Sequence, residues 1–415
     1  MKKIFWFLLI LMCSSQVFSQ FIISGVFRPR FEYRDGYSTL RDSSTDFAAF
    51  VSQRTRISMD YKDEKLNTKL TLYDFRVWGD QIWKSDQPST GIFEAWAEIF
   101  LTSNLSIRAG RQALHYDNGR LLSRVNWNQI GAAHDAVLFR YKKDKFNIDM
   151  GMAFNQSSQN LFSTTYKNIN NYKEMGFLWI NRNFDNFDIS ALSIVDGYQV
   201  SYSVPVDYAR ITAGLITKYK LNNFDFQLRL FGQGGHSKTG EELMAYYNKT
   251  DITYNINEKY KITAGLEIIS GDSDPLDNND NAFDLVLGSR HAFNGNMDYY
   301  SDPSTTANKG LINPYMLLTF QLNENNQFCL NYHYFMLNQE YEYLNNNLDR
   351  FLGHEIDLLY TKKISENVDV QSGYSIMFAS ETAEIIKNGN KDLLNNWFFI
   401  MLSVKPEFFN FSRNK

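Results

Sequence analysis

Arginine is the residue whose type and spacing in this sequence indicate a chemistry. Twelve arginines fall between Arg28 and Arg140, and several alternate with apolar residues, as in VFRPRFEYR (residues 26–34) and QRTRI (residues 53–57). Guanidinium groups keep their charge and bind carboxylates in a bidentate way. Clustered on one surface, they attract anions. The predicted solute-contacting residues are Arg28, Arg30, Arg54, Arg56, Arg76, Arg108, Arg111, Arg120, Arg124 and Arg140.

A second role is open to the same arginines, because acidic residues occupy neighbouring polar positions. Ion pairs between the two would brace a wall and leave less charge for a solute. Both roles can operate in one protein. The acidic residues concerned are Glu32, Glu94, Glu98, Asp74 and Asp149.

The elements that carry these side chains are predicted to be strands. Apolar residues recur at every second position almost throughout, for example in FNIDMGMAF (residues 146–154) and QFCLNYHYFM (residues 327–336). A period of two indicates a strand with one apolar face, and no long segment shows helical spacing. We count about 18 strands of roughly 9–14 residues, the length that a tilted strand needs to cross a bilayer. Segment 66–78 changes phase, which indicates a bulge.

Short and long connections alternate between the predicted strands, as in a barrel with periplasmic turns on one rim and extracellular loops on the other. Arg111, Arg120 and Arg124 are assigned to a long loop beyond a strand, which is expected to fold inward and narrow the path. The short turns include 102–104, 142–145, 221–223, 257–259, 323–326 and 364–367. The long segments are 35–46, 79–91, 112–133, 155–173, 271–310, 338–352 and 380–394.

A sheet of this many strands must close on itself, because an open one leaves unpaired edges. The interior is then too wide for side chains to fill and holds water, while the apolar face meets lipid. We therefore predict an all-β fold, a closed antiparallel up-and-down transmembrane β-barrel of about 18 strands. Phe27, Phe31 and Tyr33 would face lipid and their charged neighbours a wet lumen, with Pro29 as a misfit in the ladder. A secreted soluble β protein is the alternative.

The N-terminus predicts export. Residues 1–19 combine a positive start, an apolar run too short to span a bilayer, and small residues at the end. This is the pattern of a secretory signal peptide, which leaves residues 20–415 as one barrel domain. Cys13 would suggest a lipoprotein anchor, but Met12 before it is too large for that peptidase. The predicted destination is the outer membrane of a Gram-negative bacterium.

Composition argues against several classes of function. The formal charge of −4 excludes a globally basic nucleic-acid binder. Only Cys329 remains after cleavage, so no intramolecular disulfide is possible. The histidines lack metal-ligand spacing, no nucleophile or phosphate-binding motif appears, and no cofactor is predicted. Calcium binding by a loop is kept as an alternative, because carboxylate oxygens are calcium ligands and this loop holds Asp272, Asp274, Asp277 and Asp280.

Two segments resemble the alginate-export family of outer-membrane proteins. The first is RAGRQALHYDNGRLLSRVNWNQIGAAHDAVLFRY, residues 108–141, and the second, residues 270–300, is similar to the Bacteroidetes-type branch. The chain departs from the family pattern at Asn128, where an arginine is usual, and at His134, where a phenylalanine is usual. Matching residues in the first segment are Gly110, Arg111, Gln112, Leu114, Asp117, Arg120, Trp127, Gln129, Asp135 and Ala136. Matching residues in the second are Gly271, Asp272, Phe283, His291, Phe293, Gly295, Asp298 and Tyr299.

The resemblance implies an eighteen-stranded monomeric barrel whose electropositive lumen passes an anionic polyuronate outward. Its partners would be outer-membrane lipid, an anionic solute or polyuronate, and periplasmic export proteins. Some family members carry a long periplasmic turn late in the chain, where this sequence has only ISEN, residues 364–367. The runner-up is a general anion-preferring porin with no polysaccharide role. A ligand-binding or adhesive barrel and an outer-membrane enzyme are further alternatives.

Overall fold

The computed structural model describes residues 18–82, 89–168, 170–201, 207–274, 276–291 and 293–414. The signal peptide expected over residues 1–19 lies outside these, apart from Phe18 and Ser19, which begin the first strand. Within the described residues, no helix is long and apolar enough to cross a membrane. The chain is instead dominated by strands, which form one large antiparallel sheet.

The strands of this sheet have the following bounds. In the first half they are β1 (Phe18–Asp35), β2 (Ala48–Asp63), β3 (Leu66–Val77), β4 (Thr90–Phe100), β5 (Leu105–Gln112), β6 (His134–Lys143), β7 (Phe146–Phe154), β8 (Glu174–Asn183) and β9 (Phe187–Gln199). In the second half they are β10 (Asp207–Leu221), β11 (Phe224–His236), β12 (Glu242–Asn255), β13 (Tyr260–Ile269), β15 (Leu311–Asn323), β16 (Asn326–Met336), β19 (Phe351–Ser365), β20 (Val368–Ala379), β21 (Asn395–Val404) and β22 (Glu407–Asn414). The loops add β14 (Asn279–Asp280), η1 (Pro303–Thr306), the hairpin of β17 (Tyr341–Tyr343) and β18 (Asn346–Leu348), and α2 (Glu381–Lys387).

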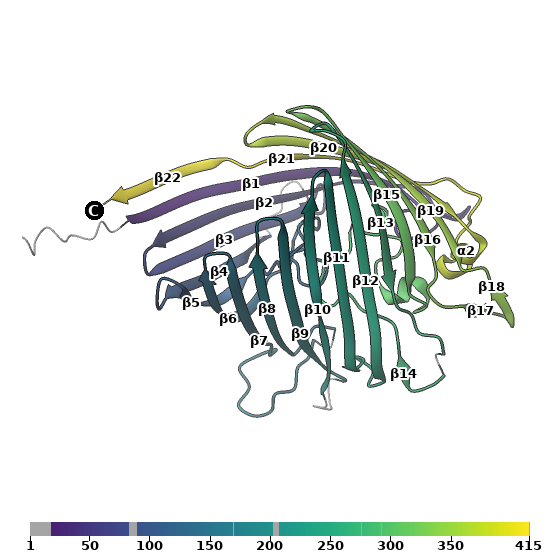
Figure 1. Ribbon diagram of the computed structural model, residues 1–415, viewed down its shortest axis with the longest axis horizontal. Coiled ribbons are helices and arrows are strands. Elements are labelled where there is room, and N and C mark those ends of the chain that lie inside the picture. The colour runs from purple at the N-terminus through teal and green to yellow at the C-terminus, as the bar shows by residue number, and fades with distance from the viewer. Residues whose placement is uncertain are drawn as a thin grey trace, which may run out of the picture.

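The sheet closes into a barrel. β1 pairs with β2 on one side and with β21 and β22 on the other, so the first and last strands lie side by side (Figure 1). β21 and β22 are two parts of the last strand, which gives an 18-stranded antiparallel barrel and confirms the predicted fold class. The alternation of short turns with long loops is also confirmed, and the turn between β19 and β20 is as short as the sequence indicates.

The two faces of β1 follow the predicted alternation. Arg28, Arg30 and Glu32 are buried on the inner face, whereas Phe27 is exposed on the outer face. Pro29 has no amide hydrogen to donate, and the ladder between β1 and β21 is interrupted beside it. The bulge expected in segment 66–78 lies instead in the neighbouring strand. β3 pairs with β2 without a shift, whereas Thr71 and Leu72 of β3 pair with Glu94 and Ile92 of β4, which leaves Phe93 of β4 as the extra residue.

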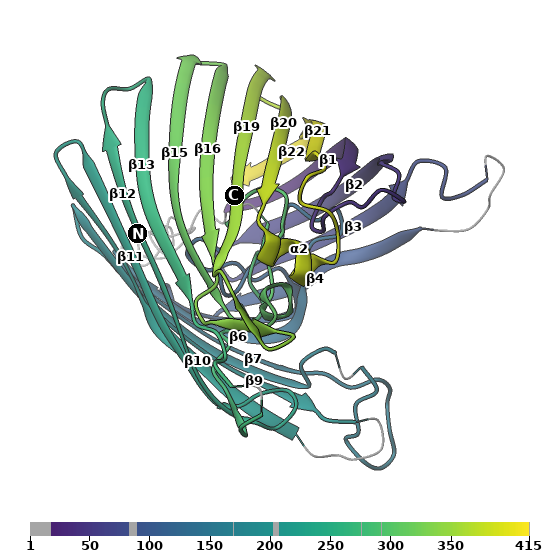
Figure 2. The ribbon, with the colours of Figure 1, turned by 90° about the vertical axis from the view of Figure 1, so that its right-hand side faces the viewer.

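Two long loops fold into the barrel and fill part of its lumen. Figure 2 shows connecting segments lying within the ring of strands. The loops 113–133 and 270–310 join through a short parallel bridge between Leu122 and Leu287, with Ser123 N–H donating to the Leu287 carbonyl at 3.2 Å. Buried apolar residues of both loops pack together there. The inward fold expected of the loop that carries Arg120 and Arg124 is therefore present, and main chain covers part of the inner face of β1.

Candidate functional site

Four arginines of β1 and β2, which we call the clamp, hold the backbone of loop 113–133, which we call the inward loop. Arg28, Arg30, Arg54 and Arg56 project from the inner face and reach residues 126–130, which we call the clamped segment. Of the four, only Arg30 forms an ion pair, with a carboxylate of its own strand, among the described residues. The other three direct their charge mainly at neutral carbonyl and amide oxygens, which accept charge-assisted hydrogen bonds without cancelling the charge.

Arg54 makes the densest set of these bonds. Its Nε donates to the Gln129 carbonyl at 2.5 Å and its Nη1 to Asn126 Oδ1 at 2.9 Å. Its Nη2 donates to the carbonyls of Asn126 and Asn128. The side chain is only 3% exposed. Every arm of this guanidinium therefore bonds to the clamped segment, and little of it faces water.

Gln129 provides the reciprocal contact. Its Oε1 accepts from Arg28 Nε at 3.0 Å and from Arg28 Nη2 at 2.9 Å. Its Nε2 donates to Ser52 Oγ at 3.1 Å. This amide is buried between the first two strands and is satisfied on both sides, so it fixes the register of the loop against the wall.

Trp127 joins the clamp to the second loop. The Arg30 guanidinium lies 4.0 Å from the centroid of the Trp127 ring, and His291 stacks on Trp127 with centroids 4.0 Å apart. Trp397 and Phe399 of β21 meet the same ring edge-on. Aromatic and cation–π contacts of this kind favour one arrangement of the two loops.

Arg120 anchors the loop at the far wall. Its Nε and Nη2 donate to Glu267 Oε1 on β13 at 2.9 and 2.5 Å, and Lys249 Nζ of β12 donates to Glu267 Oε2 at 2.9 Å. Arg120 Nη1 also donates to the Ser289 carbonyl at 3.1 Å. Since β13 lies far around the ring from β1 and β2, the loop reaches across the lumen and is held at both ends.

Two polar cavities lie inside the wall formed by β2 to β8. One of about 560 Å³ lies beneath the inward loop, and one of about 440 Å³ reaches the short turn at residues 103–104. Arg108, Arg140 and Lys142 line both cavities, which therefore adjoin. Together they outline a path along one wall from the inward loop to the rim of short turns.

Most cations at the junction of the cavities are paired. Arg108 Nη2 donates to Glu98 Oε2 at 2.5 Å, and Arg140 Nη1 donates to Glu98 Oε1 at 3.1 Å. Arg140 also pairs with Asp149 at 3.3 Å. These residues do what the bracing alternative predicts, because two guanidiniums share two carboxylates of the same wall.

Four cations that line the cavities have no such partner. No ion pair is found for Arg56, Arg124, Lys142 or Lys62 within the described ranges. Arg56 lies 3.5 Å from the centroid of the Phe93 ring and donates to the Ile130 carbonyl at 2.5 Å, both of which leave its charge uncancelled. Lys142 was not predicted to line the path, because KKDK at 142–145 was interpreted as a turn. Its in-phase spacing from Arg140 was the available signal.

Two predicted pore residues lie on the outer face. Arg76 shares the face of Asp74, with which it pairs at 2.6 Å. This is the outer face, because Asp74 pairs with Thr55 of β2, and Thr55 pairs with the outward-facing Phe27 of β1. Arg111 is three residues from Arg108 in β5, so the two cannot share a face; Arg111 pairs with the exposed Asp135 at 3.1 Å. We therefore place neither Arg76 nor Arg111 in the lumen.

The inward loop also carries buried titratable groups. Asp117 accepts from Ser190 Oγ at 2.6 Å and from Trp179 Nε1 at 3.1 Å, which fastens the loop to β8 and β9. Burial raises the pKa of Asp117 above its ordinary value of 3.8, and burial lowers the pKa of His115 below 6.5. Among the described residues, no three His, Cys, Asp or Glu side chains are placed to hold a metal ion.

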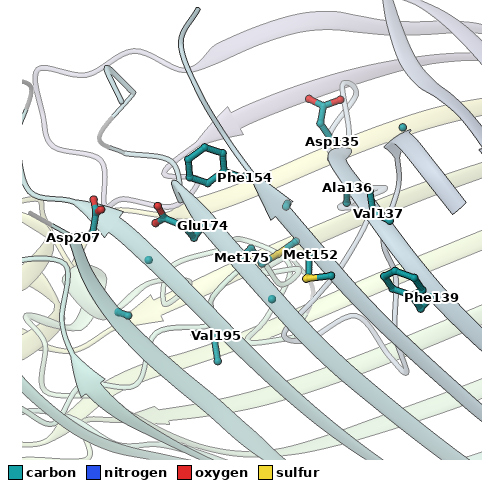
Figure 3. Close-up of a pocket in the computed structure, with 15 residues that line it drawn as sticks. Asp135, Ala136, Val137, Phe139, Met152, Phe154, Glu174, Met175, Val195 and Asp207 are labelled. Atoms are coloured by element: carbon teal, nitrogen blue, oxygen red, sulfur yellow. The ribbon is translucent and has the colours of Figure 1, made fainter. Parts of the chain in front are cut away.

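An apolar hollow of about 1040 Å³ lies on the other side of the wall (Figure 3). Val137, Met152 and Val195 line it, and their side chains are on the exposed face of β6, β7 and β9. Glu174 and Asp207 begin β8 and β10 at one end of it. Its place on the outer face separates it from the two polar cavities.

The comparisons with known proteins agree with this architecture. A sequence model of the family described as "Alginate export" matches residues 12–388. No curated protein matches the chain.

Several solved structures share the fold. The outer membrane protein OpdK of Pseudomonas aeruginosa is 10% identical, with a TM-score of 0.61 over 94% of this chain and 99% of that chain. OccK9 (OpdG) of Pseudomonas aeruginosa is 10% identical, with a TM-score of 0.64 over 94% and 98% of the two chains. OccAB4 of Acinetobacter baumannii is 9% identical, with a TM-score of 0.63 over 95% and 99%. At these identities the likeness concerns the fold alone.

Proposed function

This chain belongs to the alginate export family and is a channel-type β-barrel of the Gram-negative outer membrane, and from that premise we propose that it conducts small anionic solutes along the wall from β2 to β8. The path consists of the two polar cavities. The observation that carries the proposal is that Arg56, Arg124 and Lys142 line them without an ion pair among the described residues.

The unpaired cations set the preference for anions. A fixed positive charge in a narrow polar path raises the local concentration of anions and lowers that of cations. Arg108 and Arg140 add little net charge, because Glu98 and Asp149 compensate them. The preference is therefore modest, and the solute contacts both signs of charge as it passes.

The size of the solute is limited by the inward loop. Loop 113–133 is held at β1 and β2 by the clamp and at β13 by Arg120, so it obstructs the centre of the lumen. A polyuronate could pass only if this loop moved out of the lumen. A small solute that fits the cavity of about 560 Å³ beneath the loop could pass while the loop stays in place. Export of an acidic polysaccharide with periplasmic partners is thus the second candidate, and it rests on family membership alone.

Other parts of the proposal follow from the sequence. Residues 1–19 are removed as a signal peptide, and the barrel works as a monomer in lipid. No cofactor and no chemical step is required of this chain. If the anion-to-cation permeability ratio does not depend on the unpaired cations, the protein is a general porin with a mild preference for anions.

The decisive experiment is the reversal potential of single channels in planar bilayers under a salt gradient. Lys142→Gln is expected to lower the anion-to-cation permeability ratio by roughly five-fold, since one charge at about 4 Å in a watery path changes the free energy by about 1 kcal/mol. Lys145→Gln is the matched control, because Lys145 lies in the same hairpin but pairs with Asp185 outside the cavities. Equal ratios in both variants would remove Lys142 from the path.

A second arm separates small solutes from polymers. A monomeric uronate added to one side is expected to enter the path, block it briefly and so shorten the open times. An oligomannuronate is expected to block the mouth of the path without passing the inward loop. If the oligomer crosses the wild-type protein while the monomer shows no interaction, the polymer candidate replaces the small-solute one. A barrel that inserts and never conducts would refute both.

A further inference from the structure

Two carboxyl groups that the solute path does not use meet inside the barrel, on the side away from the two cavities. Glu355 and Asp357 of β19 are separated by Ile356, so both project from the inner face. Both side chains are 0% exposed. Side chains two residues apart in a strand are neighbours on one face, so the two carboxyl groups lie side by side, and a carboxyl group donates a hydrogen bond only when it is protonated.

The oxygens of the pair show how it is held. Glu355 Oε1 accepts the Met297 N–H at 2.8 Å, and Asp357 Oδ1 accepts from Ser375 Oγ at 2.5 Å. Glu355 Oε2 and Asp357 Oδ2 have no donor among the described residues. Only a shared proton satisfies both oxygens, and two ionised carboxylates in contact would repel each other strongly in a buried site.

Residues 293–300 of the second loop, here the seated segment, lie directly on this pair. Gly295 is in contact with Glu355, because a Cβ added there would come within 2.5 Å of the carboxyl group. Met297 and Tyr299 are completely buried, and the Met297 carbonyl accepts from Ser38 N–H at 2.9 Å. The position of the seated segment is therefore defined by a bond to Glu355 and by close packing on its carboxyl group.

The neighbouring charges do not neutralise the pair. From β16, His333 Nε2 lies 3.9 Å from Asp357 Oδ2, beyond hydrogen-bond length, while its Nδ1 faces Asn313 Oδ1 at 3.2 Å. From the second loop, His291 is engaged with Asp298 at 3.0 Å, and that aspartate adds a further negative charge. From β20, the described residues present the hydroxyl of Ser375 to the pair and no charged group.

We propose that Glu355 and Asp357 share one proton to hold the seated segment inside the barrel, and that loss of this proton releases the segment. Removal of the proton leaves two negative charges buried without a cation, a state that is unfavourable until water reaches them. Water reaches them only if the seated segment moves away. The stacking of His291 on Trp127 couples that movement to the clamped segment of the inward loop.

One cation acts in the opposite direction. Lys387 of α2 donates to the carbonyls of Tyr299 and Ser38, and burial lowers its pKa to about 8. Because its pKa is lower in the folded protein than in the unfolded chain, loss of its proton as the pH rises makes the docked state more favourable. Variants that remove the titration of the carboxyl pair expose this opposing effect.

The test is hydrogen–deuterium exchange of the seated segment in the refolded barrel in lipid nanodiscs, between about pH 6 and about pH 10, corrected for the intrinsic exchange rate. The wild-type segment is expected to open more as the pH rises, by up to about tenfold per pH unit once the proton is lost. Glu355→Gln keeps an acceptor for Met297 N–H and supplies a donor to Asp357, so its segment is expected to stay protected, with protection rising slightly through Lys387.

Asp357→Asn is the second variant, in case Glu355→Gln fails to fold, and Glu94→Gln is the control for a carboxyl group elsewhere in the lumen. A wild-type segment that does not respond to pH would overturn the proposal, as would a normal response in both pair variants. Exchange reports the segment directly, whereas conductance reports the proposed channel. A released segment in a non-conducting barrel would therefore overturn only the function proposed above.

Discussion

The clamp and the cavity wall use arginine in two different ways. In the clamp, Arg28 and Arg54 are buried and bind neutral oxygens of the loop, without a carboxylate partner among the described residues. On the cavity wall, Arg108 and Arg140 bind carboxylates of their own wall and line open space. The clamp therefore positions a loop, and the wall sets the charge of a path.

The difference teaches that a cluster of arginines is not in itself evidence of a solute site. A buried guanidinium that bonds to carbonyl groups fixes structure, because its hydrogen bonds are strong and shielded from water. A guanidinium beside water is compensated or screened, and its effect on a passing ion is smaller. Each substitution below should affect one region and leave the other unchanged.

The largest effect is expected from Arg28→Ala combined with Arg54→Ala. Charge-assisted hydrogen bonds contribute about 1.5–3 kcal/mol each, and this pair of substitutions removes several of them from one loop. The clamped segment should leave the wall, and single-channel conductance should rise severalfold. Arg76→Ala with Arg111→Ala is the control, since both residues lie on the outer face. A conductance that stays at the wild-type value would mean that the clamp does not hold the loop.

A smaller effect, confined to the wall, is expected from Glu98→Gln. This change removes the carboxylate shared by Arg108 and Arg140 but keeps a polar side chain of the same size. Anions should then be favoured by about 1 kcal/mol more than in the wild type, which is roughly five-fold in the permeability ratio. Conductance should stay close to the wild-type value. A drop in anion preference would contradict the assigned pairing.

Salt should separate the two regions without any mutation. Raising the ionic strength from about 0.1 M to about 1 M shortens the screening length from about 10 Å to about 3 Å, which weakens charges that face water. The anion preference should therefore fall with salt. Deuterium uptake of the clamped segment should not change, because its bonds are buried. Equal sensitivity of both measurements would erase the distinction.

The smallest expected effect comes from Asp117. Its pKa is raised by burial in the docked loop above the ordinary value of 3.8, so the docked state holds the proton more tightly. The contribution of Asp117 to docking is thus complete below 3.8 and declines as the pH rises through the raised value. Exchange of residues 115–119 should increase slightly over that range. Asp117→Asn keeps the acceptor and should remove the pH dependence.

Much of the fold could be predicted because strand alternation is local. The outward place of Phe27 and the inward place of Arg28 follow from a period of two, and chain length then requires closure. The change of phase in segment 66–78 was also visible, but the backbone of β3 keeps its alternation and the extra residue lies in β4. Arg76 faces outward because the apolar Phe75 and Val77 take inner positions opposite Arg54 and Ser52, which the rule that apolar residues face lipid could not predict.

The contacts of the site could not be predicted in the same way. Arg28 meets Gln129 across 101 residues of sequence, and no periodicity encodes such a pairing. The inward fold of loop 113–133 was expected, but its partners were not. Arg111 is a different case, because its odd spacing from Arg108 already placed the two on opposite faces of one strand.

The closure of the barrel has a consequence for how the protein is made. β1, the first strand described, is completed only by β21 and β22 at the other end of the chain. Ladders between such distant segments carry a large loop-closure entropy and form slowly. The nascent N-terminal strand must therefore wait, unpaired along one edge, until the last strand has been synthesised and delivered. Any truncation before residue 395 should yield a chain that is held by chaperones and degraded, never a smaller pore.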